Sequence, residues 1–227
     1  MIQLEDLPEL RDPIMIAAFE GWNDAGETAS ATLTHLARTW GAEPVAALDP
    51  EDYYDFQVNR PRTVQEGGER KVRWPTTRIL LAQDTPLDRD VLLVQGIEPS
   101  MRWMTYTQEL IDLATECEVG TLITLGGLLA DVPHTRPIPV TVTSEHEETR
   151  QRYDLEASQY EGPTGIVGVV VDAAHQAGLA TLSCWAAVPH YVSQPPNPKA
   201  TVALLRRVED VLDVEVPLAD LPAQAEE

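Results

Sequence analysis

Short apolar runs alternate along the chain with segments whose apolar residues recur every three to four positions. The runs lie at residues 14–19, 44–48, 79–82, 91–95, 121–125, 138–142 and 182–188. Apolar runs of this length, rich in Val, Ile and Leu, are typical of strands that are buried on both faces of a sheet. We therefore expect these runs to form one central sheet.

Amphipathic segments separate those runs. Asp24 and Glu27 have the spacing of a capping box, and apolar residues follow at helical spacing up to Trp40. Further helices are expected from Pro99 onward, over residues 166–177, and from Pro198 with Asn197 as its cap. This alternation predicts an α/β fold, a three-layer sandwich with a central, mostly parallel or mixed sheet.

Two segments interrupt the regular alternation. Residues 53–58 and 71–74 contain β-forming residues and are separated by the turn-rich sequence Gln65-Glu66-Gly67-Gly68, which predicts a hairpin-like excursion. Residues 144–159 are polar and predict a solvated helix or lid. We expect a single domain over residues 1–218, followed by an acidic tail, residues 219–227, that frays.

Composition narrows the function classes. The formal net charge of −21 opposes binding to nucleic acid, and no run of about 18 uninterrupted apolar residues is available to cross a membrane. The first six residues lack the basic start of a secretory signal, and only two cysteines occur, Cys117 and Cys184. These features predict a protein of the reducing cytoplasm.

Familiar motifs of metal and cofactor sites are missing. His146-Glu147-Glu148-Thr149-Arg150 begins like a zinc-binding helix but lacks the second histidine. The sequence has neither a Gly-x-Ser-x-Gly elbow nor a Gly-x-Gly-x-x-Gly turn after its first strand. We expect neither a metal ion nor a cofactor.

The tripeptide Val-Pro-His occurs twice, ending at His134 and at His190, each time after an apolar run and before a proline-rich loop. Because α/β sheets bind ligands beyond the carboxyl ends of their strands, both loops are candidate sites. His134 could donate a proton and Arg136 could clamp an anion. Alternatively, these side chains hydrogen-bond backbone carbonyls and hold a rigid loop, and the same two interpretations apply to His190 and Tyr191.

Further candidate ligand-binding residues each have a structural alternative. Asn23 and Asp24 stand at a strand-to-helix turn that could hold an anion, but a helix cap explains Asp24 equally. Trp22 could stack on a ligand ring or belong to the core or to a subunit interface. Thr164 lies in a Gly-Pro-Thr-Gly sequence that resembles a phosphate cradle only loosely and otherwise forms a turn before a helix.

Glu98 and Arg102 are the remaining candidates. They lie four residues apart around an expected helix start, so an intrahelical ion pair is the alternative to a role in ligand binding.

Several longer segments together resemble the proteasome assembly chaperone family in its bacterial and archaeal branch. The segments are residues 19–26, 96–100, 125–137, 160–165 and 189–200. The resemblance implies a nucleoside-phosphorylase-like α/β sandwich and homo-oligomers, with a trimer among the assemblies to expect. For eukaryotic relatives it implies a role in assembling proteasome α-subunit rings. It supplies no catalytic triad to map onto this sequence.

These observations lead to two main functional hypotheses. The first is a non-enzymatic, oligomeric protein of the chaperone type that binds other proteins, with proteasome subunits as the expected partners. The alternative is an enzyme or small-ligand binder with a phosphorylase-like cleft for an anionic or nucleoside-like ligand. There His134, Arg136, Glu98 and His190 would serve as acid, anion clamp, polar anchor and second base. A third hypothesis places the function in the surface of the oligomer alone.

Overall fold

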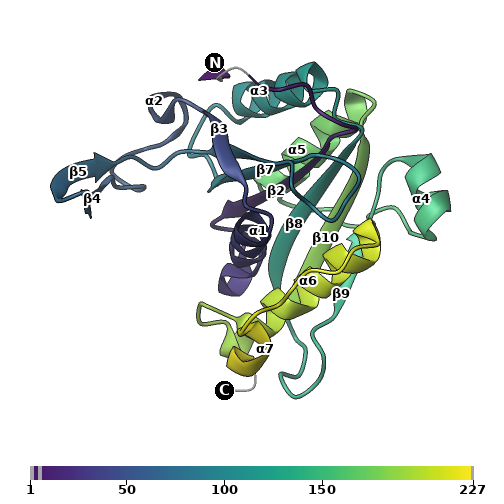
Figure 1. The fold of residues 1–227 in the computed structure, drawn as a ribbon. Coiled ribbons are helices and arrows are strands. Elements are labelled where there is room, and N and C mark those ends of the chain that lie inside the picture. The colour runs from purple at the N-terminus through teal and green to yellow at the C-terminus, as the bar shows by residue number, and fades with distance from the viewer. Residues whose placement is uncertain (1–2, 5–6, 226–227) are drawn as a thin grey trace.

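A mixed eight-stranded sheet forms the centre of the computed structural model, which describes residues 3–4 and 7–225 (Figure 1). The strands in spatial order are β1 (Gln3–Leu4), β3 (Glu43–Ala47), β6 (Arg78–Ala82), β7 (Val91–Ile97), β2 (Ile14–Glu20), β8 (Thr121–Ala130), β10 (Ala180–Pro189) and β9 (Val140–Thr143). The four strands β7, β2, β8 and β10 are mutually parallel, and antiparallel strands flank them on both sides.

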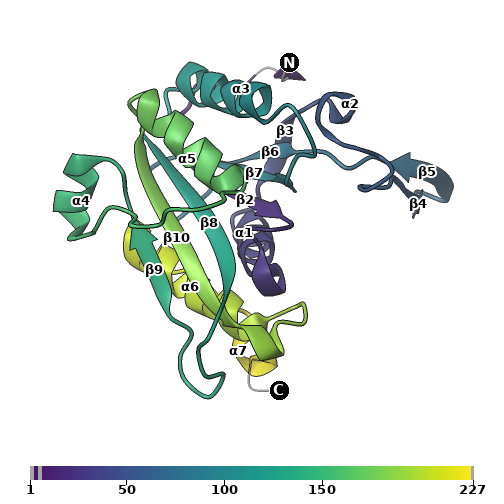
Figure 2. The same ribbon diagram turned by 180° about the vertical axis from the view of Figure 1, so that it is seen from behind.

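Helices cover both faces of this sheet. Helices α1 (Thr28–Thr39) and α6 (Pro198–Leu212) lie on one face, and α3 (Trp103–Glu116) and α5 (Ile166–Gln176) lie on the other (Figure 2). Successive residues of β2 alternate between the two layers: Ile14 and Ile16 belong to the core beneath α1 and α6, whereas Met15 belongs to the core beneath α3 and α5. The predicted three-layer α/β sandwich with a mixed sheet is confirmed.

The observed helix starts agree with the prediction at α6 but not at α3. Helix α6 begins as predicted, because Asn197 Oδ1 accepts a hydrogen bond of 3.0 Å from the backbone N–H of Ala200. The predicted start of α3 at Pro99 is wrong. The helix begins at Trp103, whose indole Nε1 donates to Pro99 O at 2.6 Å, and Arg102 before it has a left-handed φ of 56°.

The first helix also begins differently from the prediction. A short 3₁₀ helix, Ala25–Glu27, precedes α1, and Glu27 itself is left-handed with a φ of 54°. Asp24 nevertheless caps α1, because its Oδ1 accepts from the backbone N–H groups of Ala29 at 2.7 Å and Ser30 at 3.2 Å. The cap is thus made by Asp24 without the reciprocal glutamate of a capping box.

The excursion between β3 and β6 contains the hairpin, but one of its strands lies elsewhere than predicted. Residues 53–58 do not form a strand; α2 (Pro50–Tyr53) ends there, and Tyr53 and Tyr54 are buried. The hairpin consists of β4 (Arg62–Glu66) and β5 (Glu69–Arg73), joined at Gly67 and Gly68 as the turn signal predicts. It forms a separate two-stranded sheet that projects from the body (Figure 1).

The opposite side of the molecule carries a second excursion. The polar segment predicted as a helix or lid contains α4 (Glu147–Tyr153), which follows β9 and projects from the other end of the sheet (Figures 1 and 2). The chain ends beyond the short helix α7 (Leu221–Gln224). Fraying of residues 219–227 stays a prediction, and residues 226–227 lie outside the described part.

Within the described residues, no helix is both long and apolar enough to span a membrane.

Candidate functional site

The predicted site residues follow the carboxyl ends of the four parallel strands. Trp22, Asn23 and Asp24 follow β2, Glu98 and Arg102 follow β7, His134 and Arg136 follow β8, and His190 and Tyr191 follow β10. Thr164 lies just before α5. Because parallel strands end on the same side, all of these residues lie along one edge of the sheet, which we call the carboxyl edge.

Glu98 links three elements at this edge. Its Oε1 accepts hydrogen bonds from the side-chain amide of Asn23 at 2.9 Å and from the backbone N–H of Ile166 at 2.8 Å. Ile166 is the first residue of α5, and the preceding Gly165 has no side chain with which to cap the helix. Glu98 therefore supplies the cap of α5 from another strand, where a carboxylate also complements the positive end of the helix dipole.

Gly165 fits closely against this arrangement. A Cβ atom at Gly165 would lie 2.4 Å from the amide atoms of Asn23, so the close contact excludes any side chain at this position. Asn23 is buried, and its backbone carbonyl accepts from the N–H of Gly127 at 2.8 Å. The Asn23–Glu98–Gly165 contacts join β2, β7, β8 and α5 into one rigid unit.

Asp24 is buried beside this unit. Burial raises the pKa of its carboxyl group, although hydrogen bonds from Ser30 and Ala29 oppose that shift. Ser30 Oγ donates to Asp24 Oδ2 at 2.5 Å, in addition to the two backbone donors at the start of α1. Both carboxylate oxygens of Asp24 are thus engaged by the first turn of its own helix.

Arg102 does not form the predicted pair with Glu98. Its guanidinium forms an ion pair with Asp52 of α2 and lies over the ring of Tyr53, 5.7 Å from the centroid. Since α3 begins only after Arg102, the two residues never occupy one helix turn. Arg102 instead connects the start of α3 to the excursion between β3 and β6.

The two Val-Pro-His loops do meet. Tyr191 lies between the two histidine rings, with centroid distances of 5.6 Å to His134 and 5.3 Å to His190. Tyr191 Oη accepts from the backbone N–H of His134 at 2.8 Å and lies 3.1 Å from His134 Nδ1. His190 Nδ1 lies 3.4 Å from the carbonyl oxygen of Ala130, at the end of β8.

The surroundings of this pair of loops are polar and open. Lys199 Nζ donates to the carbonyl of His134, and the backbone N–H of Arg136 closes a turn on Pro133 O at 3.2 Å. The side chains of His134, Arg136 and His190 are exposed. The exposed Thr164 lies apart from them; its Oγ1 donates to the carbonyl of Gly165 at 3.3 Å.

Large apolar side chains are exposed along the same edge. Met104 is 86% exposed, Tyr160 67% and Trp22 64%. We call the following set the carboxyl-edge patch: Trp22, Met101, Met104, Leu129, Tyr160 and Tyr191. The six residues come from different segments at this edge, and exposed apolar side chains on one edge are candidates for an interaction surface.

The sequence interpretation overlooked three members of this patch. Met101 and Met104 fall within the helix expected from Pro99, and Leu129 lies on β8, which runs five residues beyond its predicted end. The available signal was the apolar pair Leu128-Leu129 directly after Gly126-Gly127, where a chain that leaves the core would ordinarily become polar.

Comparison with known proteins identifies the family. The profile of the PAC2 family matches residues 18–227. The chain belongs to the PAC2 family. This confirms the resemblance seen in the sequence, since proteasome-assembly chaperone homologues are among the PAC2 chain's structural neighbours.

Two bacterial crystal structures are particularly similar to this PAC2 chain. A PAC2 family protein from Streptomyces avermitilis is 55% identical, with 95% of this chain and 92% of that chain covered and a TM-score of 0.91. A proteasome-assembly chaperone homologue from Mycobacterium tuberculosis is 54% identical, with 94% and 91% covered and a TM-score of 0.85. The similarity extends over nearly the full length of all three chains.

A more distant neighbour shares the fold. An archaeal proteasome activator from Pyrococcus furiosus is 19% identical, with 100% of this PAC2 chain and 94% of that chain covered and a TM-score of 0.78. No curated protein matches the chain significantly.

Proposed function

We propose that this PAC2 chain is an oligomeric, non-enzymatic, chaperone-like protein of the reducing cytoplasm that binds proteasome subunits through its carboxyl edge. The observation that carries the proposal is the carboxyl-edge patch, in which six large apolar side chains face solvent. Exposed apolar and aromatic side chains of this size are suited to contact with a protein partner. The similarity to a proteasome-assembly chaperone homologue supports proteasome subunits as that partner.

The hydrogen bonding at the edge supports binding rather than catalysis. Glu98 caps α5, Asp24 caps α1 and Arg102 pairs with Asp52. Each of these groups thus stabilises the framework of the edge.

The two cysteines, Cys117 and Cys184, are buried and unpaired, which supports a reducing compartment.

Substitution at two separate points of the patch tests the proposal. We expect Met104→Asp and Leu129→Asp each to weaken binding to proteasome α-subunits of the same organism by about tenfold or more, because each places a carboxylate in an apolar contact. Biolayer interferometry with immobilised α-subunits measures the change. The matched control is Val58→Asp, which alters a 75% exposed apolar residue outside the patch and should bind like the unmodified protein.

Two outcomes of these measurements would contradict the proposal. If the unmodified protein neither binds α-subunits nor changes their assembly into rings, the proposed function is wrong. If it binds and both patch variants bind equally well, the carboxyl edge is not the binding surface.

Recognition of a small anionic or nucleoside-like ligand is the second candidate function. The contact of His134 and His190 with the same tyrosine favours it, because two titratable rings and Lys199 meet in one exposed place. Titration with inorganic phosphate and with nucleosides, followed by the NMR signals of the histidine rings, tests it. Saturable shifts that Tyr191→Phe alters would support a ligand site; unchanged signals would exclude one.

A further inference from the structure

The hairpin β4–β5 is a basic arm on an acidic protein. The hairpin together with the segments that join it to the main sheet, residues 60–78, contains six of the sixteen Arg and Lys residues and only two Glu, a net charge of +4, whereas the whole chain carries −21. The rest of the chain therefore carries −25. The basic residues are Arg60, Arg62, Arg70, Lys71, Arg73 and Arg78, and all are exposed. The last of these residues, Arg78, is the first residue of β6 and lies at the base of the arm. Such a separation of charge favours contact with an acidic surface.

The arm also lacks the support of the main sheet. Its two strands pair only with each other, and a lone two-stranded hairpin is marginally stable in water. Arg62 stands directly opposite Arg73, and Glu66 opposite Glu69, and like charges in these positions weaken a strand pair. These two like-charge pairs therefore do not stabilise the hairpin, and the exposed basic residues are placed where an external partner can reach them.

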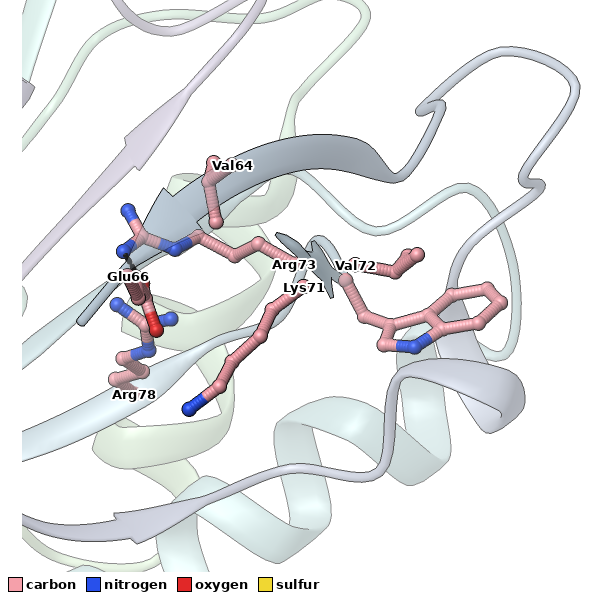
Figure 3. A pocket seen from close by; sticks show the side chains of 7 residues that line it. Val64, Glu66, Lys71, Val72, Arg73 and Arg78 are labelled. Carbon is pink, nitrogen blue, oxygen red and sulfur yellow. Dashed lines mark hydrogen bonds and ion pairs between the residues drawn. The ribbon is translucent and has the colours of Figure 1, made fainter. Parts of the chain in front are cut away.

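A hollow at the base of the arm offers a place for carboxylates. It has a volume of about 370 Å³, and Lys71, Arg73 and Arg78 line it together with Glu66, Val64, Val72 and Trp74 (Figure 3). Arg73 forms an ion pair with Glu66, which lowers the pKa of that carboxyl group. Lys71 and Arg78 add two further cations beside this pair, so the hollow is suited to an anionic side chain next to an apolar wall.

The acidic counterpart projects from the other end of the molecule. Residues 145–161, which include α4, contain six Asp or Glu and two Arg, a net charge of −4. Glu147 and Glu148 in the first turn of α4 are exposed, as is Tyr153 at its end. The arm leaves the sheet between β3 and β6 near one edge, and α4 follows β9 at the opposite edge (Figures 1 and 2).

We propose that the basic arm of one copy of this chain docks on the α4 segment of a second copy, with Glu147 and Glu148 facing Lys71 and Arg78. Because the two surfaces are different and lie at opposite ends of the sheet, the contact is head-to-tail. Repetition of such a contact gives a ring when the rotation between copies closes and an open filament when it does not. This inference rests on the homo-oligomer of the proposed function and assigns its contact surfaces.

Charge reversal and charge exchange test the pairing. We expect Lys71→Glu with Arg78→Glu to raise the dissociation constant of the oligomer by about tenfold or more, and Glu147→Lys with Glu148→Arg to do the same. A chain that carries all four substitutions restores opposite charges across every contact and should regain the oligomer. The matched control, Arg38→Glu with Arg207→Glu, reverses an exposed basic residue on α1 and a half-buried one on α6, both away from the arm and α4, and should assemble like the unmodified protein.

Sedimentation equilibrium at low and high salt measures these constants, and circular dichroism checks that each variant is folded. An oligomer of the unmodified protein that all variants retain would overturn the arm-to-α4 contact and leave the proposed function intact. Failure of the fourfold variant to restore an oligomer that both pairs weaken would overturn α4 as the acceptor. A monomeric unmodified protein at every concentration would instead contradict the oligomer of the proposed function.

Discussion

At the scale of single residues, one buried carboxylate lies away from the carboxyl edge and accepts several hydrogen bonds. Asp90 is fully buried at the amino end of β7, and its carboxylate accepts from the backbone N–H of Arg11 at 2.9 Å and from the guanidinium at 2.9 Å. Gln83 Nε2 adds a third donor at 3.3 Å. Burial alone would raise the pKa of Asp90, but the hydrogen bonds from Arg11 and Gln83 bring it below its usual value.

This arrangement predicts a specific dependence of stability on pH. A carboxyl group with a lowered pKa in the folded state stabilises the protein above its unfolded pKa, and this contribution is lost as the pH falls through the folded pKa. We expect Asp90→Asn to reduce the free energy of unfolding by about 1–3 kcal/mol at neutral pH and to reduce the loss of stability below about pH 4.

Urea unfolding at a series of pH values measures both effects. Asp88→Asn is the matched control, because Asp88 is exposed two residues away. An equal change in the two variants, or an unaltered acid profile in Asp90→Asn, would contradict the stabilising role of Asp90.

At the scale of elements, the sequence predicts those features that depend on residues close together in the chain. The buried runs became strands, and Asn197 with Pro198 started α6 where expected, because cap and proline act within one helix turn. The role of Glu98 as the cap of α5 cannot be predicted in this way. Its partners Asn23 and Ile166 lie 75 and 68 residues away in sequence, so only the folded sheet brings them together.

The strand predicted at residues 53–58 is absent because of tertiary contacts. Tyr53 and Tyr54 have high β propensity, but Tyr53 packs edge-on against Tyr106 of α3 and Tyr54 Oη hydrogen-bonds to Thr77 Oγ1 at 2.8 Å. Burial in the tertiary structure overrides the local preference there.

The phosphorylase-like character of the fold stays a prediction from the family resemblance.

Substitution of Glu98 tests its role as the cap of α5. We expect Glu98→Ala to lower the free energy of unfolding by about 1–2 kcal/mol, because it leaves the Ile166 N–H without its acceptor, whereas Glu98→Gln keeps an acceptor and should cost less. Gly165→Ala should also destabilise the protein, since its Cβ would meet the Asn23 amide.

Thermal unfolding of the three variants measures the order of these effects. Equal stability of Glu98→Ala and the unmodified protein would contradict the capping role. Loss of stability in Glu98→Gln as large as in Glu98→Ala would show that the negative charge, and not the hydrogen bond, is what matters.

At the scale of the whole molecule, one rigid sheet presents two kinds of surface. The carboxyl-edge patch includes residues of β8 and α3 as well as of the loops at the carboxyl edge, while the basic hairpin and the acidic α4 segment project from the two lateral ends (Figure 1). Composition alone predicts an acidic protein that does not favour nucleic acid. It does not reveal that positive charge is concentrated in the basic arm and negative charge in the α4 segment. A protein built in this way can form an oligomer through its lateral ends and leave the carboxyl edge available for another partner.

The central claim is that a protein partner covers the carboxyl edge. Hydrogen–deuterium exchange of this chain, measured with and without saturating proteasome α-subunits from the same organism, tests it most directly. The account predicts slower exchange at residues 100–106, 126–134 and 189–193, with unchanged exchange at residues 84–90 on the opposite edge. Unchanged exchange at the three carboxyl-edge segments, with protection elsewhere or with none at all, would contradict it.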